Sequence, residues 1–134
     1  MKNTYIIGEI GQNHNGSVDL AKLIIELISR PVHEDVFGMD FMPMNAVKMT
    51  KRALSEELAV SQMNQIYDNP NSFGRTYGEH RAFLELDDQA HFEIYKYAKS
   101  LGLDFIETLC AKGCLSLLCL LYTSPSPRDR SLSR

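Results

Sequence analysis

The feature that most constrains the fold is the opening of the chain, where a strand-like apolar run ends in a carboxylate and leads through a polar loop into a helix. Residues 5–7 favour a buried strand, and Glu9 follows one residue later, after Gly8. A carboxylate at that place loses solvation unless it is paired, hydrogen-bonded or used in a reaction. Gly16 and Ser17 favour a sharp turn into a helix that the serine hydroxyl caps. The opening segment therefore predicts a strand that delivers polar groups into a loop.

Two further polar side chains lie in this loop. Asn13 and His14 add hydrogen-bond donors and acceptors close to Glu9. They could position a substrate or support the carboxylate. The alternative is an ordinary polar turn in which Glu9 accepts backbone N–H bonds and His14 is exposed.

The rest of the chain alternates between strand and helix patterns. Helices are expected at residues 18–28, 88–101 and 111–121, and strands at residues 46–48 and 104–108. This order predicts a parallel α/β arrangement, either the beginning of a (β/α)8 barrel or a doubly wound sheet.

Two segments carry weaker patterns. Residues 32–44 are rich in glycine, proline and methionine, and we expect them to be a long connection. His91 lies in the first turn of the second long helix, where we expect its ring to be exposed.

Polar residues stand at the ends of three expected strands: Glu9, Lys48 and Thr108. The carboxyl ends of barrel strands carry the active sites of such enzymes, so this placement favours the barrel. A lysine there could hold phosphate or carboxylate, or could extend to solvent. Complete barrels typically have about 250 residues, so 134 residues predict a partial barrel of about three βα units.

The end of the chain has a different composition. Residues 119–134 become rich in serine, proline and arginine, and we expect a non-native or disordered tail after a barrel portion at residues 1–118. A tail that binds an acidic partner is the rival interpretation.

Composition excludes some classes of function. A net charge of −3 argues against a general nucleic-acid binder and against a basic protein of membrane surfaces. Neither a signal-peptide pattern nor an apolar run of membrane length is present, so we expect a cytoplasmic protein with no membrane partner. Cys110, Cys114 and Cys119 lack CxxC spacing, which predicts free buried thiols rather than a disulfide framework or a zinc site.

Three stretches, in order, resemble the sialic acid synthase family, which condenses phosphoenolpyruvate with an N-acetylated amino sugar. Residues 9–16 read Glu-Ile-Gly-Gln-Asn-His-Asn-Gly, similar to the opening motif of the family. Residues 45–52, Asn-Ala-Val-Lys-Met-Thr-Lys-Arg, resemble its second strand, and residues 97–108 resemble its next helix, glycine turn and third strand. One departure is Thr50, because many family members carry a glutamine two residues after the lysine.

The resemblance implies a TIM barrel and a synthase that forms a sialic acid-like nonulosonic acid from small-molecule substrates. Glu9 would be the catalytic residue, orienting reacting groups or managing protons. The implied substrate-binding residues are Lys48, Asn13, His14 and Thr108. A divalent metal, Mn or Mg, would act as a Lewis acid in the complete enzyme, with ligands from later strands and none in this chain. The complete protein could form a homo-oligomer.

This chain by itself is expected to be inactive, since the implied metal ligands and the opposite wall of the barrel are absent. One alternative is a noncatalytic fragment or interaction module that assembles through exposed sheet edges. Another is a Schiff-base aldolase that uses Lys48, although this leaves the loop around Glu9 unexplained.

Overall fold

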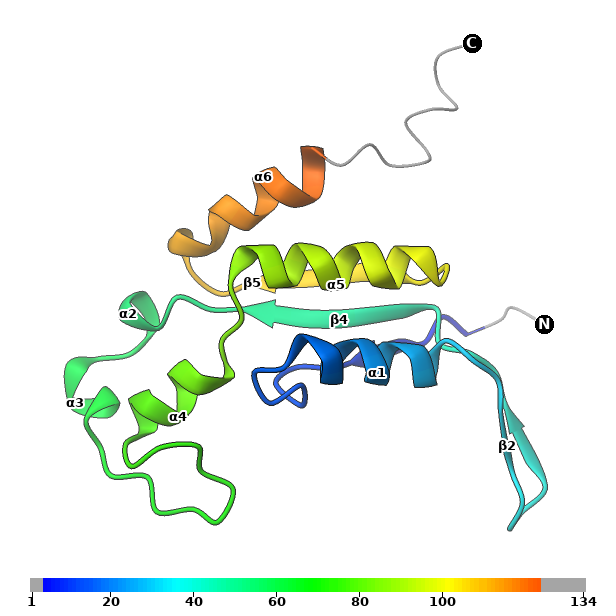
Figure 1. Cartoon of the computed structure of the whole chain (residues 1–134), viewed down its shortest axis with the longest axis horizontal. Coiled ribbons are helices and arrows are strands. Elements are labelled where there is room, and N and C mark those ends of the chain that lie inside the picture. The colour runs from blue at the N-terminus through cyan, green and yellow to red at the C-terminus, as the bar shows by residue number, and fades with distance from the viewer. Residues whose placement is uncertain (1–3, 124–134) are drawn as a thin grey trace.

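A computed structural model of the chain describes residues 4–123, and Figure 1 shows their arrangement. Strands β1 (Ile7–Glu9), β4 (Ala46–Lys51) and β5 (Asp104–Leu109) form a parallel sheet in the order β1-β4-β5. Strands β2 (Val32–Glu34) and β3 (Met39–Phe41) form a separate antiparallel hairpin. The predicted parallel α/β arrangement is therefore confirmed.

Helices connect these strands. They are α1 (Val18–Ile28), α2 (Leu54–Glu57), α3 (Val60–Met63), α4 (Tyr77–Leu84), α5 (Asp88–Ser100) and α6 (Leu115–Thr123), with a 3-10 turn at Lys112–Cys114. Helices α2, α3 and α4 lie beyond the carboxyl end of β4 (Figure 1). The long helices α1 and α5 lie side by side on the same face of the sheet (Figure 1).

The two long helices begin where their sequences predict. Ser17 caps α1, because its hydroxyl accepts a hydrogen bond from the backbone N–H of Leu20 at 3.2 Å. Asp87 caps α5 in the same way, accepting from the N–H of Ala90 at 2.8 Å. Local capping and the amphipathic pattern together fix both starts.

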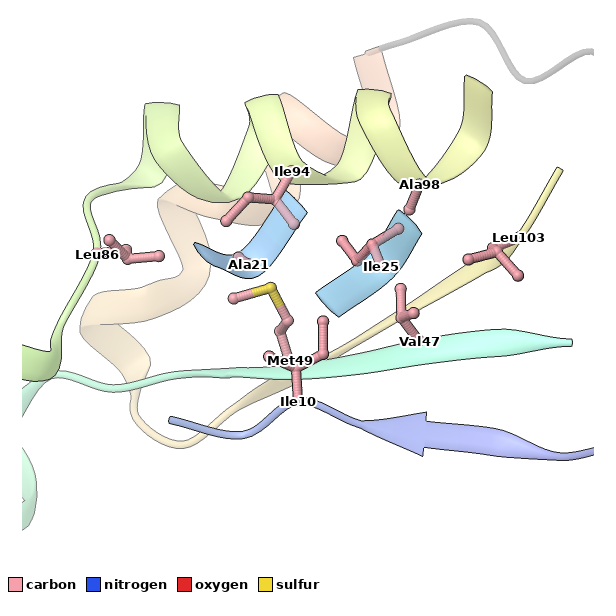
Figure 2. Packing of buried hydrophobic residues seen from close by; sticks show 9 residues of the cluster. All are labelled: Ile10, Ala21, Ile25, Val47, Met49, Leu86, Ile94, Ala98 and Leu103. Carbon is pink, nitrogen blue, oxygen red and sulfur yellow. The ribbon is translucent and has the colours of Figure 1, made fainter. Parts of the chain in front are cut away.

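The hydrophobic core lies between the sheet and these two helices (Figure 2). Its members are buried apolar residues from α1, α5, the strands and the segments next to them: Ile10, Ala21, Ile25, Val47, Met49, Leu86, Ile94, Ala98 and Leu103. Side chains alternate between the two faces of a strand, so the neighbours of Val47 and Met49 point to the opposite face.

That opposite face, called the open face below, carries the polar residues at the strand ends. Glu9 pairs in register with Lys48, and Lys48 with Ile106. One step further on, Thr50 pairs with Thr108. Since register partners in a parallel sheet share a face, these five residues lie together.

The opening strand is less buried than its sequence predicts. Tyr5, Ile6 and Ile7 are 53%, 45% and 45% exposed, so the prediction of a buried strand at residues 5–7 is wrong for this chain. The reason is position, because β1 lies at the edge of the described sheet and Ile7 belongs to the open face.

Two other segments differ from the sequence predictions. Residues 32–44 contain the β2–β3 hairpin rather than a plain connection, and Gly38 at φ +62° allows the turn between its strands. The boundary predicted at residue 118 falls inside α6, which continues to Thr123. The rest of the predicted tail, residues 124–134, lies outside the described residues. Within residues 4–123, no helix combines the length and apolar character needed to cross a membrane.

Candidate active site

Glu9 and Lys48 form an ion pair at the carboxyl ends of two adjacent strands. The Lys48 Nζ donates to Glu9 Oε2 at 2.6 Å, and the two side chains are 35% and 51% exposed, lysine first. An ion pair with this exposure contributes at most about 1 kcal/mol to stability. Its contribution to the fold is therefore small, and both partners remain accessible to a ligand that could replace either one.

Two hydroxyl groups extend this polar area along the open face. Thr50 is half-buried and Thr108 is exposed. They are register partners, and Thr50 lies two residues after Lys48 on the same face of the sheet. Hydroxyl and ammonium groups are hydrogen-bond donors that suit phosphate and carboxylate oxygens. The strand ends thus present a cation and two hydroxyls beside one carboxylate.

The other two predicted substrate residues are occupied in holding the loop. The Asn13 side-chain amide donates to the carbonyl of Ile10 at 2.9 Å. The His14 ring is 2% exposed, and its Nδ1 accepts from the N–H of Gly16 at 3.1 Å. Burial lowers the pKa of His14, with the charge of His91 as a second cause. The alternative of an exposed His14 is therefore wrong, and its geometry favours support of the loop.

The sequence patterns did not predict a buried acid–base pair on the helix-covered face of the sheet. His91 Nδ1 lies 3.0 Å from Glu107 Oε2, and the two side chains are only 1% and 4% exposed. His91, expected to be exposed, is buried because α5 turns it toward β5, on the same face as Ile94 and Ala98. Its helical spacing from those two apolar residues was the signal in the sequence that could have revealed this burial.

Glu85 is a second residue that the sequence patterns did not single out. Its carboxylate accepts from Gln12 Nε2 at 3.1 Å and from the backbone N–H of Arg52 at 3.3 Å. Burial raises its pKa, while the Arg52 hydrogen bond and nearby cations act in the opposite direction. This carboxylate joins the opening loop to the end of β4.

A cavity of about 520 Å³ lies beside the opening loop. Gln12 and Asn15 of that loop line one part of it, and the segment that precedes α4 supplies most of the remainder. The aromatic ring of Phe73 stacks on His80 at a centroid distance of 5.8 Å, so the outer wall is built from packed rings.

The described part of the chain does not form a metal site. No group of three or more His, Cys, Asp or Glu residues that could hold a metal ion occurs among residues 4–123. The carboxylate of Glu9 is engaged with Lys48. Of the three cysteines, Cys114 is buried, whereas Cys110 and Cys119 are exposed, so the prediction of buried thiols is correct only for Cys114. These residues therefore do not fit a complete divalent-metal centre.

Comparison with known proteins gives consistent relatives, although no family model matches the chain. It is 33% identical over 118 residues to the N-acetylneuraminate-9-phosphate synthase of Drosophila melanogaster, covering 87% of this chain and 28% of that protein. The human N-acetylneuraminate-9-phosphate synthase is 33% identical over 101 residues, which cover 75% of this chain and 25% of the relative. The N,N'-diacetyllegionaminic acid synthase of Campylobacter jejuni is 33% identical over 108 residues, or 81% of this chain and 29% of the relative.

A solved structure shares the fold. The N-acetylneuraminic acid (sialic acid) synthetase of Leptospira borgpetersenii, in complex with citrate, matches with a TM-score of 0.58 and 18% identity. The match covers 88% of this chain and 33% of that one. This chain spans about a quarter of the length of the curated relatives it matches. From the motifs, the sequence relatives and the shared fold together, the chain belongs to the sialic acid synthase family.

Proposed function

We propose that the protein containing this chain condenses phosphoenolpyruvate with an N-acetylated amino sugar to form a sialic acid-like nonulosonic acid. The observation that carries the proposal is the Glu9–Lys48 pair at 2.6 Å on the open face, in a chain whose relatives are named as synthases of such acids. Those names favour a synthase over an interaction module that assembles through sheet edges.

Each residue has a role that follows from its chemistry. Lys48 would hold the anionic phosphoenolpyruvate, and the hydroxyls of Thr50 and Thr108 would donate to its oxygens. Binding of that anion would compete with the ion pair and release Glu9 to orient reacting groups or transfer protons. Asn13 and His14 would keep the loop that carries Glu9 in place.

The overall reaction balances with water as a reactant. The enol carbon of phosphoenolpyruvate forms a C–C bond to the aldehyde carbon of the open-chain sugar, and the aldehyde oxygen takes a proton. Water adds at the carbon that bears the phosphate ester, the C–O bond to phosphate breaks, and inorganic phosphate leaves. Glu9, as a carboxylate beside the site of C–C bond formation, is the group of this chain suited to move these protons.

A (β/α)8 barrel is part of the proposal. Support comes from parallel strands in the order β1-β4-β5, with α1 and α5 covering one face (Figure 1). The open face would become the interior of the barrel, which would also cover the exposed Ile7. A divalent metal, Mn or Mg, would polarise the sugar aldehyde when bound, and its ligands would come from outside residues 4–123.

Phosphate release by the complete protein that contains this chain tests the assignment. Glu9→Gln keeps the shape of the side chain and removes its charge, so kcat should fall by about 10²–10⁴-fold while the melting temperature stays unchanged. Lys48→Ala should chiefly raise KM for phosphoenolpyruvate, because it deletes the charged contact. Lys99→Ala is the matched control, since Lys99 is also exposed and paired, but it lies in the last turn of α5 and its partner Asp104 begins β5, at the end of that strand away from Thr108.

Two results would reject these roles of Glu9 and Lys48. Wild-type kinetics in both the Glu9 and the Lys48 variants would show that neither residue takes part in the reaction. Borohydride trapping of a keto acid on Lys48 would point instead to a Schiff-base aldolase. The chain of 134 residues by itself should release no phosphate.

A further inference from the structure

The segment between α4 and the first turn of α5, residues 85–91 and called the brace below, contacts strands β4 and β5 and the loop that follows β1. Its contacts come from four residues: Glu85, Leu86, Asp88 and His91. Lys51 and Glu107 lie on the helix-covered face, so the contacts of Leu86, Asp88 and His91 leave the open face free.

Glu85 makes the connection between β1 and β4. One carboxylate oxygen accepts from the side chain of Gln12 and the other from the backbone of Arg52, at 3.1 and 3.3 Å. Gln12 follows Glu9 by three residues, and Arg52 follows Lys48 by four. A single half-buried carboxylate therefore ties together the two segments that carry the ion pair.

The same brace holds the other strand ends. Lys51 Nζ donates to the carbonyl of Leu86 and lies 3.7 Å from Asp88 Oδ1. His91 holds Glu107 at 3.0 Å in a buried pair. Asp88 also accepts from the hydroxyl of Ser116 at 2.6 Å, which connects the brace to α6.

Strand alternation makes these contacts relevant to the open face. Lys51 and Glu107 lie on the helix-covered face, directly next in sequence to Thr50 and Thr108 on the open face. Fixing one residue of a strand restricts the position of its neighbour. A misplacement of about 1 Å among reacting groups can cost on the order of 10²-fold in rate.

We propose that Glu85 is a positioning residue that sets the separation between the Glu9 loop and the Lys48 strand through its two hydrogen bonds. It acts through Gln12 and the backbone of Arg52 and does not touch substrate. The consequence for turnover rests on the proposed function, whereas the structural link between the two strand ends does not.

Two variants and one control test this role. Glu85→Ala removes both acceptor oxygens, whereas Glu85→Gln keeps the size of the side chain and one acceptor. Glu93→Ala is the control, because Glu93 is an exposed glutamate of α5 paired with Lys22, far from the strand ends in sequence and contacts. All three are made in this chain and in the complete protein.

The first readout is amide hydrogen exchange in this chain, measured residue by residue by NMR. In Glu85→Ala we expect the Arg52 amide to exchange at least about tenfold faster, with smaller acceleration in Glu85→Gln and no change in Glu93→Ala. Amides in the middle of α5 should keep their protection. If Glu85→Ala unfolds the chain, the test rests on Glu85→Gln. This variant preserves the packing and should still make the Arg52 amide exchange faster than in the wild type.

The second readout is the kinetics of the complete protein. Glu85→Ala should lower kcat by about 10–100-fold with KM for phosphoenolpyruvate within about threefold of wild type, and Glu85→Gln should restore part of kcat. Unchanged Arg52 exchange in both Glu85 variants would overturn the proposal. A wild-type kcat in Glu85 variants whose Arg52 amide exchanges faster would also overturn it. A complete protein without phosphoenolpyruvate-dependent phosphate release would reject the proposed function, while the exchange data would still decide the structural link.

Discussion

Replacing Gly16 by alanine separates two requirements of the opening loop, namely its backbone conformation and its close contact with α4. Gly16 adopts φ +72°, and a Cβ there would lie 2.4 Å from the carbonyl oxygen of Phe83. Gly38, in the hairpin turn, adopts a similar φ of +62° but has nothing within 4 Å of its Cβ position. Gly38→Ala is therefore a matched control for the cost of the backbone conformation alone.

The expected magnitudes follow from this geometry. A left-handed conformation costs a non-glycine residue about 1–2 kcal/mol, and this applies to both variants. The contact of 2.4 Å at Gly16 falls well below an ordinary contact distance and involves backbone, which cannot rotate away. Overpacking of this kind adds about 1–3 kcal/mol. We therefore expect a loss of about 2–5 kcal/mol for Gly16→Ala and about 1–2 kcal/mol for Gly38→Ala.

Urea unfolding of the chain, followed by far-ultraviolet circular dichroism, measures both losses. With a urea slope of about 2 kcal/mol per molar, the midpoint should fall by about 1–2.5 M for Gly16→Ala and by about 0.5–1 M for Gly38→Ala. Equal losses in the two variants would refute the argument from the Phe83 contact. A smaller loss at Gly16 than at Gly38 would refute it more strongly.

Two further perturbations address the buried histidines. His91→Ala should destabilise the chain by about 3–5 kcal/mol in urea unfolding, because it leaves the carboxylate of Glu107 buried without its partner; Lys99→Ala, at an exposed pair, should cost at most about 1 kcal/mol, and equal losses would contradict this reasoning. Burial lowers the pKa of His14 below its usual 6.5, so the unfolded chain binds a proton that the folded chain resists, and the stability contributed above pH 6.5 should be lost as the pH falls through the folded pKa. His14→Gln should reduce this fall in stability below pH 6.5, and an unchanged pH curve would show that His14 does not cause it.

Local signals predicted the long helices well. The apolar spacing of residues 18–28 and the capping hydroxyl of Ser17 act within a few residues, and α1 has the predicted bounds. The end of β4 was harder to predict. Its strand continues to Lys51, three residues beyond the prediction, because pairing with β5 and the contact of Lys51 with Leu86 extend it. Both partners are distant in sequence.

The supports of the site escaped prediction for the same reason. Glu85 joins Gln12 to Arg52, which lie 73 and 33 residues away from it in the sequence. His91 meets Glu107 across 16 residues and two elements. A single sequence does not show which of these residues are partners, because only the folded arrangement brings them together.

The packing contacts and the proposed substrate contacts lie on opposite faces of the same strands, and this bears on the one departure from the family motif. Thr50 stands where many family members carry a glutamine, and it lies on the open face as the register partner of Thr108. Its sequence neighbours Met49 and Lys51 belong to the other face, where Met49 is fully buried in the core and Lys51 contacts the brace. If the open face binds phosphoenolpyruvate as proposed, a change at residue 50 alters the groups that would meet the anion while the packing that holds β4 stays the same. Because threonine is shorter than glutamine, it leaves more room beside Lys48, and under the proposed function the departure would change substrate contacts rather than the fold.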